Sequence, residues 1–197
     1  TIHISLTMDY TFGNGGVMRS ITGYRKFDSF GTDDSERLAV DIADATFGDI
    51  DLRIFSQEFQ YVSPDDQPLS YVVGLYFYDQ RLDDTFRVGG GFFTPNPLFR
   101  VSTANSLIKV LHAAAFANLT WRVADDWEVQ AGLRLLYEDQ SMTGIRTGNF
   151  FGPNRPFNQV GVSDTDWVGR LSLRYNPNSD TSLFVTANRG YKGFGLN

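Results

Sequence analysis

The sequence predicts an all-β fold, an antiparallel transmembrane β-barrel segment of about eight strands with short periplasmic turns and long extracellular loops. Three observations support this prediction. Apolar and polar residues alternate with a period of two over long stretches, which is typical of strands with one apolar and one polar face. Short and long connections alternate along the chain, and aromatic residues occur where the apolar faces of the strands end.

The expected strands are long and follow one another through the chain. In WEVQAGLRLLYED (residues 127–139), alternate residues from Trp127 to Tyr137 are apolar, and the residues between them are polar or small except Leu136. The same pattern predicts strands at TIHISLTMDYTF (1–12), LSYVVGLYFYDQ (69–80), HAAAFANLTWR (112–122) and DWVGRLSLRY (166–175), with weaker patterns at 16–27, 50–62 and 181–192. Strands of about ten residues or more are long for a globular sheet and suit a membrane-spanning one.

The connections fall into two classes. The short ones, at GNG (13–15), SPDDQP (63–68), ADD (124–126) and NPNSD (176–180), contain the Gly, Asn, Asp and Pro that tight hairpin turns require. The long ones, at about 28–49, 83–107 and 143–163, are rich in Gly, Asp, Asn and Pro. Membrane barrels have short periplasmic turns and longer extracellular loops, so this asymmetry favours a barrel in the outer membrane of a Gram-negative bacterium.

Large aromatic residues mark both ends of the apolar faces. Trp121, Trp127 and Tyr175 lie beside short turns, whereas Tyr137 and Trp167 lie at the opposite strand ends. Amphipathic rings favour the membrane–water interface, so these five residues are expected to form two aromatic girdles around a lipid-facing band. Contact with outer-membrane lipid is therefore predicted.

Composition excludes several classes of function. The chain of 197 residues has no cysteine, and its net charge of −6 makes nucleic acid an unexpected partner. Mean hydropathy is −0.24, and no apolar run is long enough for a transmembrane helix. His3 and His112 are too isolated in the sequence to predict a metal site, the Asp-Asp pairs suit turns and loops, and nothing indicates a nucleophile or a cofactor. An enzyme is not expected.

The direction of the first and last strands indicates whether the chain is a whole barrel or a part of one. If the short turns are periplasmic, both ends of the chain are extracellular, whereas self-contained bacterial barrels keep both termini inside. We therefore expect a piece from the middle of a larger barrel. Two alternatives stay open: a complete eight-stranded outer-membrane barrel acting as an adhesin or small-solute channel, and a soluble β-sandwich or calyx that binds a small ligand.

Four stretches resemble strands of the TonB-dependent outer-membrane receptors. They are SQEFQ (56–60), YVVGLYFYDQ (71–80), AGLRLLYED (131–139) and NRGYKGFGLN (188–197). The chain departs from the family pattern at Gln60, Leu136, Phe194 and Leu196, where Arg, an aromatic residue, Gly and Phe are usual. The order and spacing of the four stretches over about 140 residues make the resemblance specific.

The resemblance implies a function that depends on more than these residues. Receptors of this family import scarce nutrients, most often ferric siderophores, by displacing a plug domain with energy delivered through TonB. Residues 1–197 resemble barrel strands alone, without the plug, the TonB box or the closing C-terminal strand. The expected partners are therefore a plug domain and the TonB complex, both reached through the rest of the parent protein, and a siderophore-type ligand.

Two sets of residues are candidates for function. The polar face is expected to point into the lumen, where its side chains either contact the plug and the passing solute or pair with one another as scaffolding; these are Glu58, Glu128, Gln130, Arg134, Glu138, Arg170 and Arg174. Phe92, Phe93, Phe150 and Phe151, in the long connections, are candidates for an extracellular ligand pocket.

Overall fold

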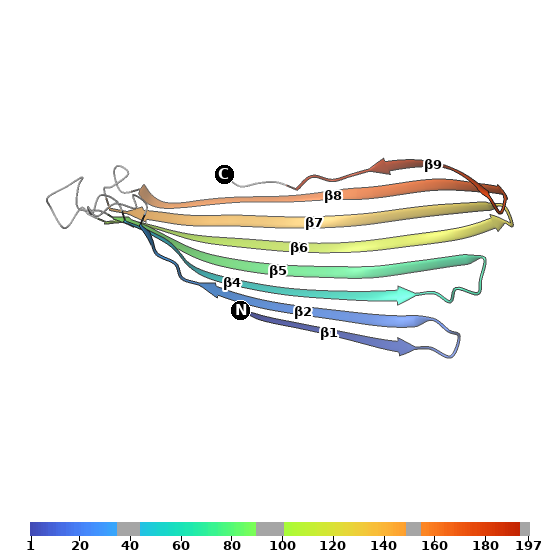
Figure 1. Cartoon of the computed structure of the whole chain (residues 1–197), viewed down its shortest axis with the longest axis horizontal. Coiled ribbons are helices and arrows are strands. Elements are labelled where there is room, and N and C mark those ends of the chain that lie inside the picture. Colours follow the sequence, from blue (N-terminus) through green and yellow to red (C-terminus); the bar gives the residue numbers. More distant parts are fainter. Residues whose placement is uncertain (35–43, 90–100, 149–154, 194–197) are drawn as a thin grey trace.

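The chain folds into one long antiparallel sheet (Figure 1). The computed structural model describes residues 1–34, 44–89, 101–148 and 155–193. The strands are β1 (Ile2–Thr11), β2 (Val17–Ser29), β3 (Asp33–Asp34), β4 (Asp44–Val62), β5 (Leu69–Gly89), β6 (Val101–Ala124), β7 (Trp127–Thr147), β8 (Arg155–Asn178) and β9 (Thr181–Arg189). The prediction of about eight strands is confirmed, and the two-residue β3 adds a short pairing with β4.

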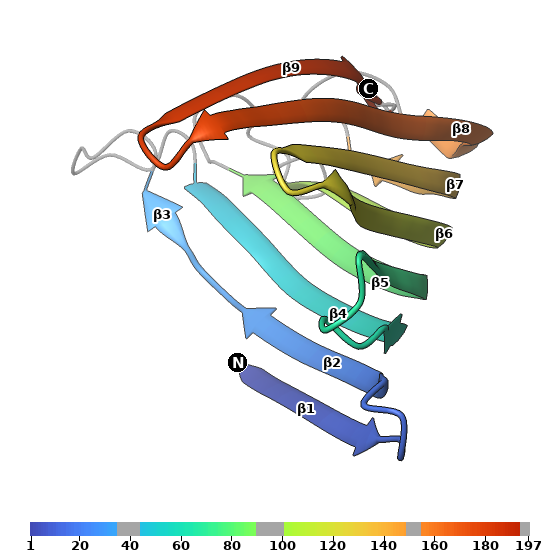
Figure 2. The same ribbon diagram turned by 90° about the vertical axis from the view of Figure 1, so that its right-hand side faces the viewer.

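The sheet is a single curved layer, open at β1 and β9 (Figure 2). Long strands pair in the order β1-β2-β4-β5-β6-β7-β8-β9, each antiparallel to the next. No second layer covers the sheet in the part of the chain described, and the only buried apolar residues there are Val88 and Ala114. A β-sandwich buries a core between two sheets, so the described part of the chain does not form one. In the described residues β1 and β9 do not pair, so the sheet does not close into an eight-stranded barrel either.

The strands extend further than the sequence pattern predicted. Residues 44–49, 83–89, 101–107, 143–147 and 155–163, which were expected to lie in long loops, belong to strands, whereas β9 ends at Arg189 rather than at residue 192. Alternation disappears in these extensions because polar residues occupy both faces, yet backbone pairing continues. The 24 residues of β6 give a strand on the order of 80 Å long, well beyond the thickness of a bilayer.

The short connections form tight turns at one end of the sheet, on the right in Figure 1. In the β1–β2 turn, Gly15 adopts a φ of 84°, which favours glycine, and its N–H donates to the Phe12 carbonyl at 2.9 Å. In the β8–β9 turn, Asn178 Oδ1 accepts from the Asp180 N–H at 3.0 Å. Turn chemistry and strand pairing therefore agree at this end of the sheet.

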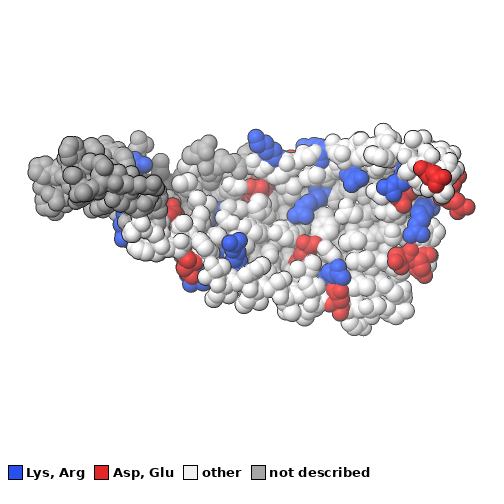
Figure 3. All heavy atoms as spheres, in the orientation of Figure 1, with Lys and Arg blue, Asp and Glu red and all other residues white. Residues whose placement is uncertain are grey.

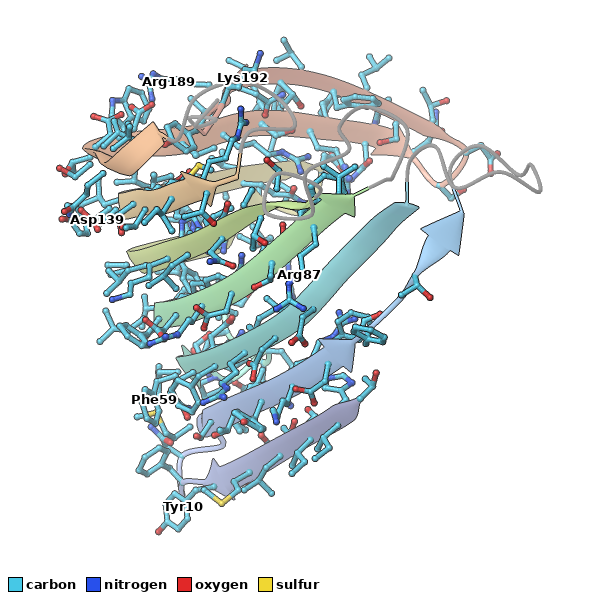
Figure 4. All side chains as sticks on the ribbon, turned by 90° about the vertical axis from the view of Figure 1, so that its left-hand side faces the viewer. Tyr10, Phe59, Arg87, Asp139, Arg189 and Lys192 are labelled. Atoms are coloured by element: carbon cyan, nitrogen blue, oxygen red, sulfur yellow. The ribbon has the colours of Figure 1, made fainter. Side chains whose placement is uncertain are left out.

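Register gives the sheet two different faces. The convex face exposes large apolar side chains, among them Ile4, Leu6, Phe59, Leu75, Leu133, Leu135 and Leu171, and Figure 4 shows Tyr10 and Phe59 pointing outward there. Along β7 this apolar band runs from Trp127 to Tyr137. Ten residue steps of about 3.4 Å, inclined by about 40°, cover roughly 26 Å, close to the ~25 Å apolar band of membrane barrels.

Candidate functional site

Register gathers polar and aromatic side chains on the concave face, level with Tyr137. Tyr78 on β5 lies opposite His112 on β6, and His112 lies opposite Glu138 on β7. Alternate residues of a strand share a face, so the even-numbered positions of these three strands all project here. Figure 3, which looks onto this face, shows charged residues distributed along the whole length of the sheet.

Glu138 is the buried centre of this group, with only 4% of its surface exposed. Its Oε1 accepts a hydrogen bond from Gln140 Nε2, and its Oε2 lies 3.5 Å from His112 Nδ1. The Tyr191 hydroxyl donates to Oε2 at 3.3 Å. A carboxylate removed from water needs such partners. They come from β7 itself, from β6 and from the segment after β9, so Glu138 holds distant parts of the chain together.

Tyr191 reaches Glu138 because the chain leaves the sheet after β9. Pairing with β8 ends at Arg189, opposite Gly169. The Arg189 guanidinium lies 2.7 Å from Asp166 Oδ1 and 4.4 Å from the Trp167 ring centroid, on β8. These contacts fix the point of departure, from which the next residues carry Tyr191 onto the concave face.

Arg134 lies close to two aromatic rings, on the same face of β7 as Glu138. Its guanidinium carbon is 5.2 Å from the Tyr76 ring centroid and 5.8 Å from that of Phe116. Arg134 and Tyr76, together with Tyr78 and Glu138, line a hollow of about 380 Å³, whereas Phe116 lines the neighbouring one. The hollow therefore combines stacking surfaces with one cationic and one anionic group, which suits a flat polar ligand or a protein side chain.

A second hollow of about 490 Å³ lies nearer the short turns, with Glu58, Arg134 and Arg170 on its walls. The Gln60 amide donates to Glu58 Oε1 on the same strand. Gly132 provides part of the floor, because a Cβ there would lie 2.6 Å from Asn118 Oδ1. With Arg189, three cationic side chains and one carboxylate thus face the same open space.

Close to the short turns the polar side chains pair with one another. Glu128 Oε1 accepts from Gln130 Nε2 at 2.8 Å and lies 3.4 Å from Arg174 Nη1. Asp9 and Arg19 form a two-pronged pair between β1 and β2, with both N···O distances 2.8 Å. These contacts are cross-strand scaffolding of the kind that stabilises a sheet face.

The match of the sequence to known families decides what this curved sheet is. The model of the family described as TonB dependent receptor-like, β-barrel matches residues 2–196. The chain belongs to this family. Its antiparallel sheet, with short turns at one end and an exposed apolar face, is therefore a segment of a TonB-dependent receptor barrel.

Known receptors resemble the chain in sequence and in fold. Pesticin receptors of Yersinia pestis and of Yersinia enterocolitica serotype O:8 are each 29% identical to it over 134 residues, 68% of the chain and 18% of the receptor. The ferric yersiniabactin uptake receptor FyuA from Yersinia pestis superposes with a TM-score of 0.76 at 18% identity, over 93% of the chain and 27% of the receptor. The chain thus spans less than a third of each of these receptors.

All seven polar residues proposed from the sequence lie on the concave face of this receptor barrel segment. The structure brings Glu58, Arg134 and Arg170 to one hollow, and Glu128, Gln130 and Arg174 to another group. The sequence did not single out their aromatic neighbours Tyr76, Tyr78, Phe116 and Tyr191, and it gave His112 no partner. The first three and His112 were recognisable as polar-face positions, but the return of Tyr191 was not.

The five proposed girdle residues lie on the convex face of the receptor barrel segment. Trp127 stacks on Tyr175 with ring centroids 4.4 Å apart, beside a short turn. Trp121, Tyr137 and Trp167 are each more than 40% exposed. Their role at a membrane interface stays a prediction. Phe92, Phe93, Phe150 and Phe151 lie outside the described residues.

Proposed function

We propose that the protein containing this chain is an outer-membrane receptor that imports a ferric siderophore with energy delivered through TonB. The main support is the family match over residues 2–196. The named relatives narrow the choice of cargo, since one structural neighbour is an uptake receptor for ferric yersiniabactin. The cargo of the parent protein is then a ferric chelate, whose exact chemistry depends on parts of the receptor beyond this sheet.

In this proposal the two faces of the sheet have different partners. The convex apolar face contacts outer-membrane lipid, with Trp121, Trp127 and Tyr175 at the periplasmic side and Tyr137 and Trp167 at the extracellular side. The concave face surrounds a plug domain. An exposed apolar band of membrane thickness and a charged opposite face support this assignment.

The concave residues divide by the contacts they already make. Glu128, Gln130 and Arg174 satisfy one another, so we assign them to scaffolding of the lumen wall. Arg134, Glu58 and Arg170 border open hollows, and we assign them to contacts with the plug or the passing chelate. Glu138 combines both roles, because its buried carboxylate also faces the first hollow. Phe92, Phe93, Phe150 and Phe151 remain candidates for the extracellular ligand pocket.

Uptake of radiolabelled ferric siderophores by cells under iron restriction tests the proposal. Deleting the gene is expected to abolish uptake of one class of chelate, and the wild-type gene is expected to restore it only in cells that have TonB. Restoration in cells without TonB would contradict the energy source. Unchanged uptake of every ferric siderophore tested, with loss of another nutrient instead, would contradict the cargo.

A further inference from the structure

Four basic residues form a continuous row across the convex face, just beyond the apolar band. Lys26 on β2 lies opposite Arg53 on β4, Arg53 opposite Arg81 on β5, and Arg81 opposite Lys109 on β6. Like charges directly opposite each other on neighbouring strands destabilise a sheet. This cationic row, Lys26–Arg53–Arg81–Lys109, therefore needs anions to compensate it.

Aspartates supply part of the compensation, from the side away from the apolar band. Asp51 accepts from Arg53 Nε and Nη2 at 2.9 and 2.8 Å, and Asp83 accepts from Arg81 Nε at 2.8 Å. Asp28 lies 3.1 Å from Lys26 Nζ. In the described part of the chain, Lys109 forms no ion pair. A guanidinium has five N–H donors, so the arginines keep donors that the aspartates do not use.

At β2 and β4, the side chains next to the row on the side of the short turns are aromatic. Tyr24 is two residues from Lys26, and Phe55 is two residues from Arg53, on the same face. Two residue steps correspond to a height of roughly 5 Å on an inclined strand. At β5, by contrast, Asp79 lies between Arg81 and the apolar Phe77. Asp79 also lies opposite Phe55, so Lys26 and Arg53 are the two residues of the row whose next same-face neighbours on their own strands, towards the short turns, are aromatic.

We propose that Lys26 and Arg53 bind the phosphate groups of an anionic lipid in the outer leaflet. Lipid headgroups lie immediately above the apolar band, at the height of this pair. Arg and Lys together match phosphate in charge and hydrogen-bond geometry, and each basic residue near an anionic membrane surface strengthens attraction to it. The proposal rests on the outer-membrane location given in the proposed function, but it is independent of the cargo.

Two double variants separate lipid binding from a structural role of the ion pairs. They are Lys26→Gln/Arg53→Gln and Asp28→Asn/Asp51→Asn. The first variant removes the phosphate donors, whereas the second removes the carboxylates that compete with phosphate. Lipid binding therefore predicts effects of opposite sign. A purely structural role predicts that both variants lower thermal stability and leave lipid retention unchanged.

The experiment uses the full-length protein purified in detergent and titrated with bisphosphorylated lipid A, with dephosphorylated lipid A as the control, followed by native mass spectrometry. We expect the first variant to bind the phosphorylated lipid on the order of tenfold more weakly and the second to bind it more tightly. Three results would overturn the proposal. They are dephosphorylated lipid A that binds as tightly as the phosphorylated lipid, inorganic phosphate that competes as well as phosphorylated lipid A does, and variants that both bind the phosphorylated lipid with unchanged affinity.

The failure of this inference and the failure of the proposed function give different results. Membrane fractionation tests the location on which both depend. In a protein found in the outer membrane, normal siderophore uptake with no selective lipid binding refutes only the lipid site. Selective lipid binding in a protein that imports no ferric chelate refutes only the cargo.

Discussion

Gly74 shows how one missing side chain shapes the concave face. A Cβ at this position would lie 2.5 Å from Phe116 Cζ and 2.6 Å from the Phe59 carbonyl oxygen. The ring can move, but the carbonyl belongs to the neighbouring strand. Gly74→Ala is therefore expected to lower the free energy of unfolding by about 1–3 kcal/mol, as overpacked substitutions do.

The matched control for Gly74→Ala is Gly161→Ala on β8, where the nearest atom to an added Cβ is 3.5 Å away. Urea unfolding of the full-length protein in detergent, followed by tryptophan fluorescence, measures both variants. Equal stability of the two would show that the close approach of Phe116 to Gly74 does not constrain the sheet.

Glu138 is the residue whose loss should affect the concave face most. Glu138→Ala removes the acceptor for Tyr191 and the partner of His112 while leaving both side chains in place. His112 and Tyr191 are only half-buried, but hydrogen bonds to a charged group contribute about 1.5–3 kcal/mol, so a loss of stability of about that size is expected. Glu138→Gln keeps an acceptor and should lose less.

Glu128→Ala provides the comparison for Glu138→Ala. The Glu128 side chain is 21% exposed and its partner Arg174 is 46% exposed, so water replaces the lost contact. Glu128→Ala should lower the free energy of unfolding by no more than about 1 kcal/mol, the usual range for exposed ion pairs. The same urea titration applies, and a larger loss for Glu128→Ala than for Glu138→Ala would contradict the role of burial.

At the scale of elements, the sequence predicted strands and faces well because alternation records which side chains meet an apolar environment. It could not predict the strand ends. At Asp83 and Asp84, for example, both faces are polar, so the period-two signal is absent although β5 continues to Gly89. The boundaries of a strand in water depend on pairing with neighbours, which composition does not reveal.

The cross-strand register could not be predicted from the sequence either. His112 lies opposite Glu138 because of the turn at Asp125–Asp126 and the irregularity between Arg122 and Ala124. A change of one residue in that register would place either side chain on the other face. The concave residues were therefore predictable as members of one face, whereas their partners were not.

At the scale of the whole molecule, the exposed apolar face requires lipid, and charge placed on it should be tolerated according to depth. Leu133, 48% exposed, lies near the middle of the apolar band of β7, and Thr143 lies on the same strand and face beyond the cationic row. Leu133→Arg is expected to cost about 2–4 kcal/mol and Thr143→Arg at most about 1 kcal/mol, because the cost of Arg falls towards the interfaces. Quantitative blotting of outer-membrane fractions and thermal unfolding in detergent measure the two variants of the full-length protein. If water rather than lipid covered the convex face, both arginines would be tolerated alike, and the membrane assignment of this face would fail.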